Sequence, residues 1–175
     1  AGFLFNGLGR NIWSKKTIAY NGTMYIFASF VFSLIAFWNV QEQGAITVHF
    51  FDFINTSTVK IPFDFRVDAL SSLFLLVITG VGTLIHLYSA AYMKDETAPH
   101  YARYFAYLNL FIFSMLLLVL GSNYFVLFFG WEGVGVASYL LIGFYYRKPS
   151  ANAAAIKAFV VNRVGDFGFL LGIFA

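Results

Sequence analysis

The sequence predicts an all-α polytopic transmembrane helix bundle with a small extramembrane hairpin between its second and third spans. Sixty per cent of the residues are hydrophobic and 11% are charged, whereas charged residues make up about a quarter of a typical soluble domain. The hydrophobic residues fall into long runs, and a helix of about 20 apolar residues crosses a hydrocarbon core about 30 Å thick. Basic residues gather in the short segments between these runs, which is typical of multi-span membrane proteins.

The first part of the chain predicts one partial and one complete span. Residues 1–8 are apolar and are expected to be the end of a first span, and residues 9–16 form a basic loop. The second span is expected at residues 17–39. Tyr20 and Trp38 lie near its ends, where amphipathic rings favour the membrane interface.

Residues 41–66 are more polar and predict a hairpin outside the membrane. Residues 45–50 and 58–63 alternate between apolar and polar side chains, as half-buried strands do. Residues 55–57, Asn-Thr-Ser, supply the turn between them. Residues 1–66 therefore hold the end of span one, span two and an outside polar loop.

The third span, expected at residues 67–92, carries a polar stripe. Its members are Asp68, Ser72, Thr79, Thr83 and His86, separated by 4, 7, 4 and 3 residues. These spacings place all five on one face of a helix. Because lipid does not tolerate such a stripe, this face is expected to lie against other helices or water. There the side chains could hold water or relay protons.

Three more spans follow at short intervals. Span four is expected at residues 104–120, and residues 121–123 are too few for anything but a tight turn into span five, residues 123–146. Pro149 fits the beginning of a helix, so residues 147–151 are expected to separate spans five and six. Span six runs from residue 152 and is expected to be incomplete at residue 175, so we expect the chain to be part of a longer protein.

The basic residues predict the orientation of these spans. The loops at 9–16, 93–103 and 147–151, with the start of span six, share one side of the membrane. They hold eight basic residues, Arg10, Lys15, Lys16, Lys94, Arg103, Arg147, Lys148 and Lys157. The other side holds Lys60 and Arg66. By the positive-inside rule, the side with eight is cytoplasmic, or the matrix side in a mitochondrion.

Two acids and an arginine are expected at a common depth in the membrane. Glu132 lies nine residues after Asn123, about 13 Å along the helix. Arg163 and Asp166 are three apart in span six and are neighbours on its surface. Counted from the turn at Lys148, Glu132 is sixteen residues back and Asp166 eighteen forward, so an antiparallel pair of helices brings them within about one turn of each other.

This combination of charges predicts proton or ion transfer. Burial favours the protonated form of a carboxylate and a nearby cation favours the ionised form. A unit charge about 4 Å away contributes about 4 kcal/mol at an effective dielectric constant of about 20, which is enough to gate protonation. His86 could pass protons near neutral pH, with Ser72, Thr79 and Thr83 holding water.

Structural alternatives remain open for most of these residues. Arg163 and Asp166 could form a pair that only neutralises itself, and His86 could be a hydrogen-bonded packing residue. The Ser/Thr stripe could join helices rather than hold water. Glu132 differs, because no cation of its own helix lies one turn away.

Composition also excludes several kinds of site. The chain has no cysteine, so it cannot hold thiolate-bound iron–sulfur clusters or cysteine-ligated zinc. The three histidines fall in different segments and offer no haem pair on one helix. We therefore expect no metal site, no bound cofactor and no nucleic-acid partner, and no directly bound small-molecule substrate other than protons.

The motifs around the buried charges resemble one family. They are FGWEGVGVASYLLIGFYY at 129–146, NAAAIKAF at 152–159, NRVGD at 162–166, VDALS at 67–71 and HLYSAAYM at 86–93. Together they resemble the large antiporter-like membrane subunit of proton-pumping NADH:quinone oxidoreductase, respiratory complex I. The resemblance implies that residues 67–175 are spans three to six of a proton-translocating region.

The resemblance also assigns roles to residues. It implies that Glu132 is the span-five glutamate that pairs with a lysine on the span after next, which would follow residue 175. Asp166 and Arg163 match the charged pair of span six, and His86 lies at a family histidine. NADH, FMN, iron–sulfur clusters and quinone are expected in partner subunits, and the chain itself is expected to contact other membrane subunits and lipids.

Three functions follow from these observations. The first is proton translocation across an energy-transducing membrane, the bacterial inner membrane or alternatively the mitochondrial inner membrane, coupled to NADH:quinone oxidoreduction in other subunits. The second is the large subunit of a multi-subunit Na⁺/H⁺ antiporter. In the third, the buried charges only fix the register of a scaffold.

Overall fold

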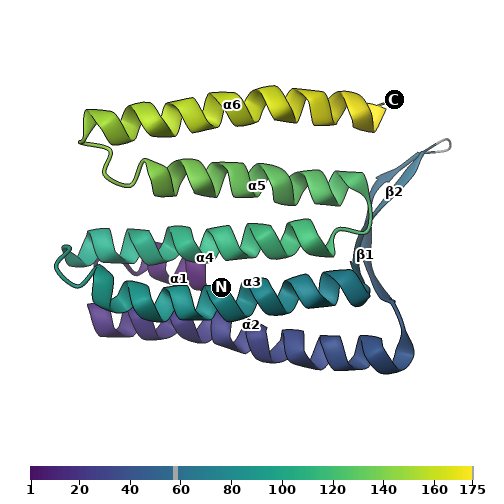
Figure 1. The fold of residues 1–175 in the computed structure, drawn as a ribbon, viewed down its shortest axis with the longest axis horizontal. Coiled ribbons are helices and arrows are strands. Elements are labelled where there is room, and N and C mark those ends of the chain that lie inside the picture. The colour runs from purple at the N-terminus through teal and green to yellow at the C-terminus, as the bar shows by residue number, and fades with distance from the viewer. Residues whose placement is uncertain (57–58, 175) are drawn as a thin grey trace.

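The computed structural model describes residues 1–56 and 59–174, and it places six helices side by side with a β-hairpin across one end (Figure 1). The elements in chain order are α1 (Gly2–Leu8), α2 (Lys15–Gln43), β1 (Ile46–Asn55), β2 (Lys60–Val67), α3 (Ala69–Tyr92), α4 (Ala98–Leu120), α5 (Tyr124–Ile142) and α6 (Pro149–Phe174). Residues 57, 58 and 175, in the expected hairpin turn, second strand and sixth span, lie outside the described residues.

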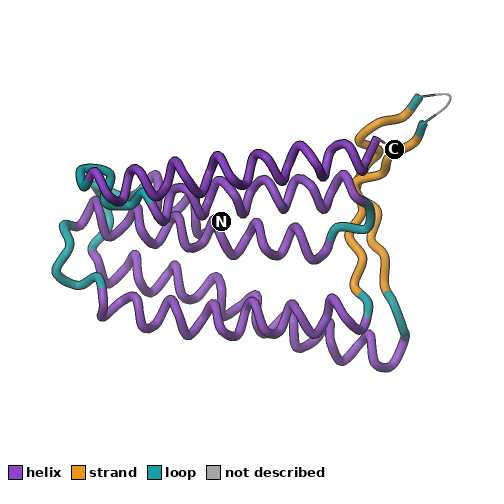
Figure 2. Tube along the Cα trace, turned by 45° about the horizontal axis from the view of Figure 1, so that its top comes forward, coloured by secondary structure: helices purple, strands orange, loops and turns teal. Residues whose placement is uncertain are grey.

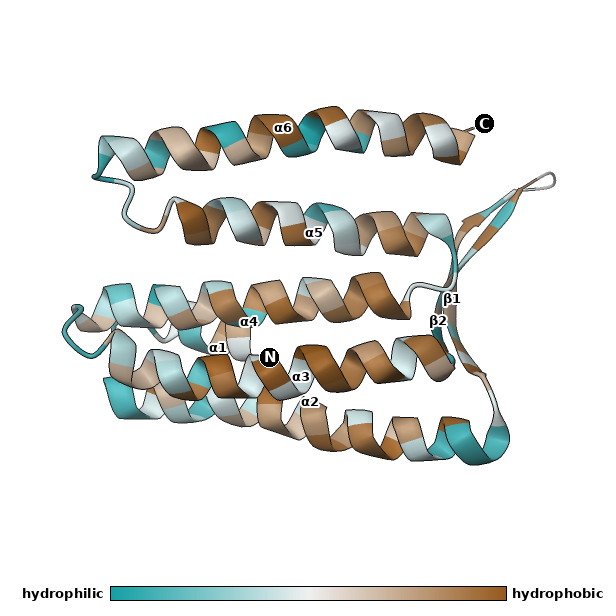
Figure 3. Cartoon of the chain, viewed as in Figure 1, coloured by the Kyte–Doolittle hydropathy of each residue, from teal (hydrophilic) through white to brown (hydrophobic). Residues whose placement is uncertain are grey.

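The long helices confirm the predicted class, a helical membrane bundle with a small hairpin. In the described part of the chain, α2, α3, α4 and α5 are long and apolar enough to cross a membrane. Helix α6 is as long, with 26 residues, but Lys157, Arg163 and Asp166 make it more polar, as its teal bands show (Figure 3). Span six thus forms a helix of sufficient length to cross a membrane, but its composition alone does not qualify it as a span.

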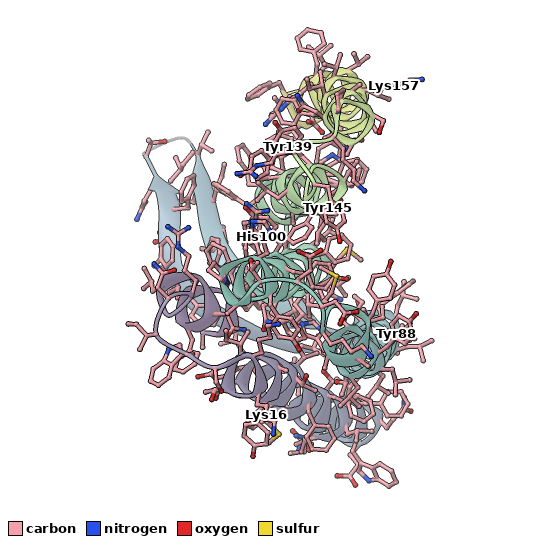
Figure 4. All side chains as sticks on the ribbon, turned by 90° about the vertical axis from the view of Figure 1, so that its left-hand side faces the viewer. Lys16, Tyr88, His100, Tyr139, Tyr145 and Lys157 are labelled. Carbon is pink, nitrogen blue, oxygen red and sulfur yellow. The ribbon has the colours of Figure 1, made fainter. Side chains whose placement is uncertain are left out.

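Helix α3 is apolar outside and polar inside. Ser72, Thr79 and His86 are fully buried against neighbouring helices. On the opposite face Leu84 is 65% exposed and Tyr88 is 68% exposed, and Tyr88 projects away from the bundle (Figure 4). This arrangement reverses that of a water-soluble bundle and matches a helix that faces lipid or partner subunits with its apolar side.

Capping residues move several helix ends from their predicted positions. Helix α2 begins at Lys15 because the Ser14 hydroxyl caps it, accepting from the Thr17 N–H at 3.3 Å. Helix α4 begins at Ala98, six residues before the expected start of span four, since Pro99 fits the first turn of a helix. The loop expected at 93–103 is therefore reduced to 93–97, and Arg103 lies on a helix.

Span five is also shorter than predicted. Helix α5 ends at Ile142, and Gly143 caps it with an N–H bond to Tyr139 O at 2.9 Å. Residues 143–148 then form the connection to α6, in place of the loop expected at 147–151. The loops that were assigned to one side of the membrane do gather at one end of the bundle (Figure 1), where the Lys15 ammonium donates to Lys94 O at 2.9 Å.

The hairpin crosses the opposite end of the helices (Figure 2). Strands β1 and β2 are antiparallel, longer than predicted, and shifted in register between His49 and Phe51. The Asn123 side chain joins the hairpin to the bundle, because its Nδ2 donates to Pro62 O at 2.7 Å while its Oδ1 caps α5. The hairpin is thus anchored on the turn between α4 and α5.

Helices α4 and α5 approach closely at a glycine. A Cβ on Gly130 would clash with the backbone of Leu118, and one on Gly133 would lie 2.6 Å from the Ser114 hydroxyl oxygen. Only glycine allows the two helices this distance. Helix α6 packs along the other side of α5, its main neighbour among the described elements.

Candidate functional site

The candidate site lies between α5 and α6, where Glu132 meets Arg163. Arg163 Nη1 donates to Glu132 Oε1 at 2.8 Å. The guanidinium also lies 4.8 Å above the ring of Phe159, one turn earlier on α6. The predicted antiparallel pairing therefore brings Glu132 to an arginine of the next helix.

Asp166 completes the cluster through a different donor. Its Oδ1 accepts a hydrogen bond from Trp131 Nε1 at 2.7 Å, and its Oδ2 lies 3.8 Å from Arg163 Nη1. The local pair expected between Arg163 and Asp166 is thus the longer of the two contacts of this guanidinium. Indole and guanidinium together supply the partners that a buried carboxylate needs.

The three charged side chains of the cluster differ in solvent exposure, from the buried Asp166 to the exposed Arg163. The Asp166 side chain is 9% exposed, that of Glu132 24% and that of Arg163 46%. With both acids ionised, two negative charges face one positive charge. One guanidinium therefore lies within reach of two carboxylates and is the least enclosed of the three groups.

Small residues give the cluster its shape. Gly133 follows Glu132 directly and brings Ser114 of α4 close to the backbone of α5. Gly135 faces the Asn162 side chain, whose Nδ2 would lie 3.8 Å from an added Cβ. Gly133 is thus a close-packing position against α4, whereas Gly135 leaves an ordinary contact distance toward α6.

His86 occupies a separate polar site among α3 and α4. Its Nδ1 lies 2.7 Å from Gly82 O, and its Nε2 lies 3.2 Å from Asn109 Nδ2. Since a carbonyl only accepts, Nδ1 carries the proton and Nε2 accepts from the amide. Neither bond leads to Glu132, so the structure places His86 apart from the charged cluster.

The hydroxyls of the α3 stripe bond mainly to their own helix. Thr79 donates to Leu75 O at 2.6 Å and Thr83 to Thr79 O at 2.7 Å, while Ser72 donates to Ala69 O at 2.9 Å. Thr79 also reaches the Ser33 hydroxyl of α2 at 3.3 Å. The bond between Thr79 and Ser33 joins α3 to α2, as expected if the Ser/Thr stripe serves to hold helices together.

Asp68 does not lie on the inner face of α3 but caps its first turn. Its Oδ1 accepts from the Ser71 N–H at 2.9 Å, and the Ser71 hydroxyl bonds the Asp68 N–H at 2.7 Å in return. The Ser71 N–H holds the pKa of Asp68 below its ordinary value. Helical spacing placed Asp68 on that face and missed its capping role, although Asp directly before an apolar run is a signal for the start of a helix.

Three residues of these sites were not singled out from the sequence. Trp131 binds Asp166, Asn109 binds His86, and Ser114 contacts Gly133. Asn109 and Ser114 carried a signal, because they are polar residues inside an otherwise apolar span. In the described part of the chain, no group of three histidine or acidic side chains could hold a metal ion.

Two family descriptions match the chain. Residues 53–105 match "NADH-Ubiquinone oxidoreductase (complex I), chain 5 N-terminus", and residues 121–175 match "NADH:quinone oxidoreductase/Mrp antiporter, TM". The second match contains Glu132, Arg163 and Asp166, and the first contains His86.

Curated proteins of one name are similar to the chain. NADH-quinone oxidoreductase subunit L of Rhodobacter capsulatus is 49% identical over 98% of the chain and 25% of its own length. The subunit L of Mycobacterium tuberculosis is 55% identical over 75% of the chain and 20% of its own length, and that of Rickettsia bellii 42% over 99% and 27%. The chain thus spans about a quarter of the length of these relatives.

Proposed function

Since the chain belongs to the family of antiporter-like membrane subunits of NADH:quinone oxidoreductase, complex I, we propose that it translocates protons across an energy-transducing membrane. In this proposal the redox reaction takes place in other subunits. The chain supplies membrane helices and carries no redox centre of its own. NADH, FMN, iron–sulfur clusters and quinone belong to the partner subunits.

One observation carries the proposal, namely the arginine between two acids on adjacent helices. Arg163 Nη1 lies 2.8 Å from Glu132 Oε1 and 3.8 Å from Asp166 Oδ2. A shift of the guanidinium by about an ångström toward α6 would exchange the closer partner. Such a shift costs little, because Arg163 is the most exposed group of the cluster.

This exchange couples charge position to proton binding. When the cation lies against Glu132, the ionised carboxylate is favoured. When it shifts by about an ångström toward Asp166, Glu132 loses about 1–2 kcal/mol of this attraction at an effective dielectric constant of about 20. A carboxyl in a membrane that loses its counter-cation favours the protonated form. Glu132 would therefore take up a proton in one position of Arg163 and release it in the other.

Residues of α3 extend the proposed route away from the cluster. His86 and the hydroxyls of Ser72, Thr79 and Thr83 lie buried on its inward face. The lone pair of His86 Nε2 is engaged by Asn109, so a relay through His86 requires that bond to open. Asp68 is left out of the route, since it caps the helix.

Membrane orientation is part of the same proposal. The end of the bundle that carries the basic loops is assigned to the cytoplasmic side of a bacterial inner membrane, or to the matrix side in a mitochondrion. The hairpin then lies outside. Partners are the other membrane subunits of the complex and the surrounding lipids, against which the apolar outer faces of α2 and α3 would pack.

A multi-subunit Na⁺/H⁺ antiporter is the second candidate, because the description of residues 121–175 names both kinds of protein. The relatives above carry the name of the first. Copurification decides between them. The first function expects flavin and iron–sulfur subunits in the purified complex, and the second expects neither.

The test of pumping replaces Glu132 with Gln in the full-length subunit of the assembled complex. We expect fewer protons moved per NADH oxidised in inverted vesicles, measured by quenching of a pH-sensitive dye. Glu42→Gln is the matched control, because Glu42 is exposed at the end of α2. A normal proton yield in Glu132→Gln, with normal assembly, would favour the scaffold role instead.

A further inference from the structure

A pocket at the basic end of the bundle contains an arginine that the proposed function does not use. The cavity has a volume of about 170 Å³ and lies among α4, the connection after α5 and the start of α6. Its polar lining residues are Arg103, Tyr107, Tyr139, Tyr146 and Asn152. The loop ends that surround it face the viewer in Figure 4, where Tyr139 is labelled.

Arg103 is held in place but only partly satisfied. Its Nη2 donates to Phe144 O at 3.0 Å, and the guanidinium lies 4.9 Å from the ring centre of Phe144 and 5.1 Å from that of Tyr146. The Nε–H is buried and bonds to no group of the described residues. No carboxylate in that part of the chain forms an ion pair with Arg103.

The charge around the pocket is positive. Arg147 and Lys148 follow Tyr146 in the connection to α6. Asp95 and Glu96 lie in the connection between α3 and α4 at this end. Glu96 is engaged by the Tyr145 hydroxyl at 2.9 Å and by His100 Nδ1 at 3.4 Å. In the described part of the chain, neither acid forms an ion pair with Arg103.

The positive charge at this end of the bundle also acts on the Tyr146 phenol. Arg147, through hydrogen bonding and charge, and then Arg103 lower the pKa of the Tyr146 phenol. A phenol becomes easier to ionise where negative charge is stabilised. The mouth of the pocket thus favours an anionic oxygen.

The position in the membrane narrows the choice of anion. Arg103 directly precedes residues 104–120, the apolar run assigned to span four, so it is expected at the edge of the hydrocarbon core, within reach of the lipid headgroups. A volume of about 170 Å³ is below the roughly 300–1,000 Å³ of pockets for drug-sized ligands. The space suits a single small anionic group with hydroxyl and amide partners.

We propose that Arg103, with Tyr107, Tyr139 and Asn152, forms a binding site for a phosphate group, supplied by a phospholipid headgroup or by free phosphate. The guanidinium offers donors in a planar fork that matches phosphate oxygens. The tyrosine hydroxyls and the Asn152 amide add neutral donors. This site is independent of the Glu132 cluster and of the pumping proposal.

The test compares phosphatidylglycerol with diacylglycerol of the same acyl chains, added to the full-length protein purified in detergent with its native partners. Native mass spectrometry counts the bound lipid. The wild-type protein is expected to bind phosphatidylglycerol at least about tenfold more tightly, because only this lipid carries the phosphate. Equal affinity of the wild-type protein for both lipids would overturn the proposal. This comparison does not depend on whether a variant folds.

Variants then locate the site. Arg103→Gln is expected to weaken phosphatidylglycerol binding about tenfold. Lys157→Gln removes the same charge from a side chain that points away from the bundle (Figure 4) and should change it less than about twofold. Arg103→Lys keeps the positive charge but lacks the planar pair of donors, so an intermediate loss of phosphatidylglycerol affinity is expected. This variant replaces Arg103→Gln if the glutamine variant does not fold. Unchanged binding in a folded Arg103 variant would contradict the assignment.

A third arm identifies the source of the phosphate. Inorganic phosphate is added to the wild-type protein as a competitor, at increasing concentration and constant ionic strength. Displacement of phosphatidylglycerol by inorganic phosphate indicates a site for the free anion. Retention of the lipid against phosphate indicates that the acyl chains take part and that the site belongs to a phospholipid.

Discussion

Replacing Gly130 with Ala should separate α4 from α5 and destabilise the bundle. The Cβ of alanine would clash with both the backbone nitrogen and the Cα of Leu118. Backbone atoms cannot rotate away as the end of a flexible side chain can. The two helices must therefore move apart along their common face, which also contains the contact between Gly133 and Ser114.

The size of the effect follows from two opposing contributions. Alanine in place of a helical glycine favours the helix by about 1 kcal/mol. Insertion of a methyl group into a close-packed contact costs about 1–3 kcal/mol. Gly135→Ala is the matched control on the same helix, since its Cβ would lie 3.8 Å from Asn162 Nδ2, an ordinary contact distance. The difference between the two variants isolates the steric cost, which we expect to be about 1–3 kcal/mol.

Thermal unfolding of the purified protein in detergent, followed by circular dichroism, measures this difference. Gly130→Ala should melt below the wild type and Gly135→Ala at or above it. Equal melting temperatures for the two variants would refute the close approach of α4 and α5 at Leu118. A drop for both would show instead that α5 tolerates no added methyl group on either face.

Two further predictions concern single hydrogen bonds. Trp131→Phe removes the indole N–H that binds Asp166 at 2.7 Å. We expect a loss of about 1.5–3 kcal/mol of stability, the range for hydrogen bonds to charged groups. Trp13→Phe, which removes an indole remote from Asp166, is the control, and an equal loss of stability in both variants would contradict the assignment. Asp68→Ala should cost about 1 kcal/mol as a lost helix cap, whereas Asp68→Asn should retain most of it. The pKa of Asp68 is lowered in the folded protein from its ordinary value of 3.8. At a pH above 3.8 the ionised Asp68 therefore contributes fully to stability, and this contribution is lost as the pH falls through the lower pKa of the folded protein. Acid titration of the melting temperature should therefore show a smaller decrease in Asp68→Asn than in the wild type.

The sequence was most informative where hydropathy and spacing decide the structure. Apolar runs predicted the long helices, and counting from the turn near Lys148 predicted that Glu132 and Asp166 would lie at a similar depth. The short connection made that count reliable, because few residues separate the two helices. The inward position of Ser72, Thr79 and His86 also followed from spacing, since polar groups avoid lipid.

Side-chain partners were harder to predict, because they depend on rotamers and on the rotation of each helix about its axis. Spacing paired Arg163 with Asp166, and this contact is present at 3.8 Å. The guanidinium lies closer to Glu132, however, and the indole of Trp131 makes the shorter bond to Asp166. Helix ends depended on local caps. Pro99 extended α4 backward, and Asp68 became a cap rather than a member of the inner stripe.

The turn between α4 and α5 gives the hairpin a mechanical role. Asn123 bonds Val126 N at 3.0 Å with its oxygen and Pro62 O at 2.7 Å with its nitrogen. The turn also bonds β2 directly, since the Ser122 N–H donates to Asp64 O at 3.3 Å. The start of α5 and strand β2 are therefore expected to move together. A displacement of α5 that moves Glu132 past α6 must either tilt the hairpin with it or break these bonds.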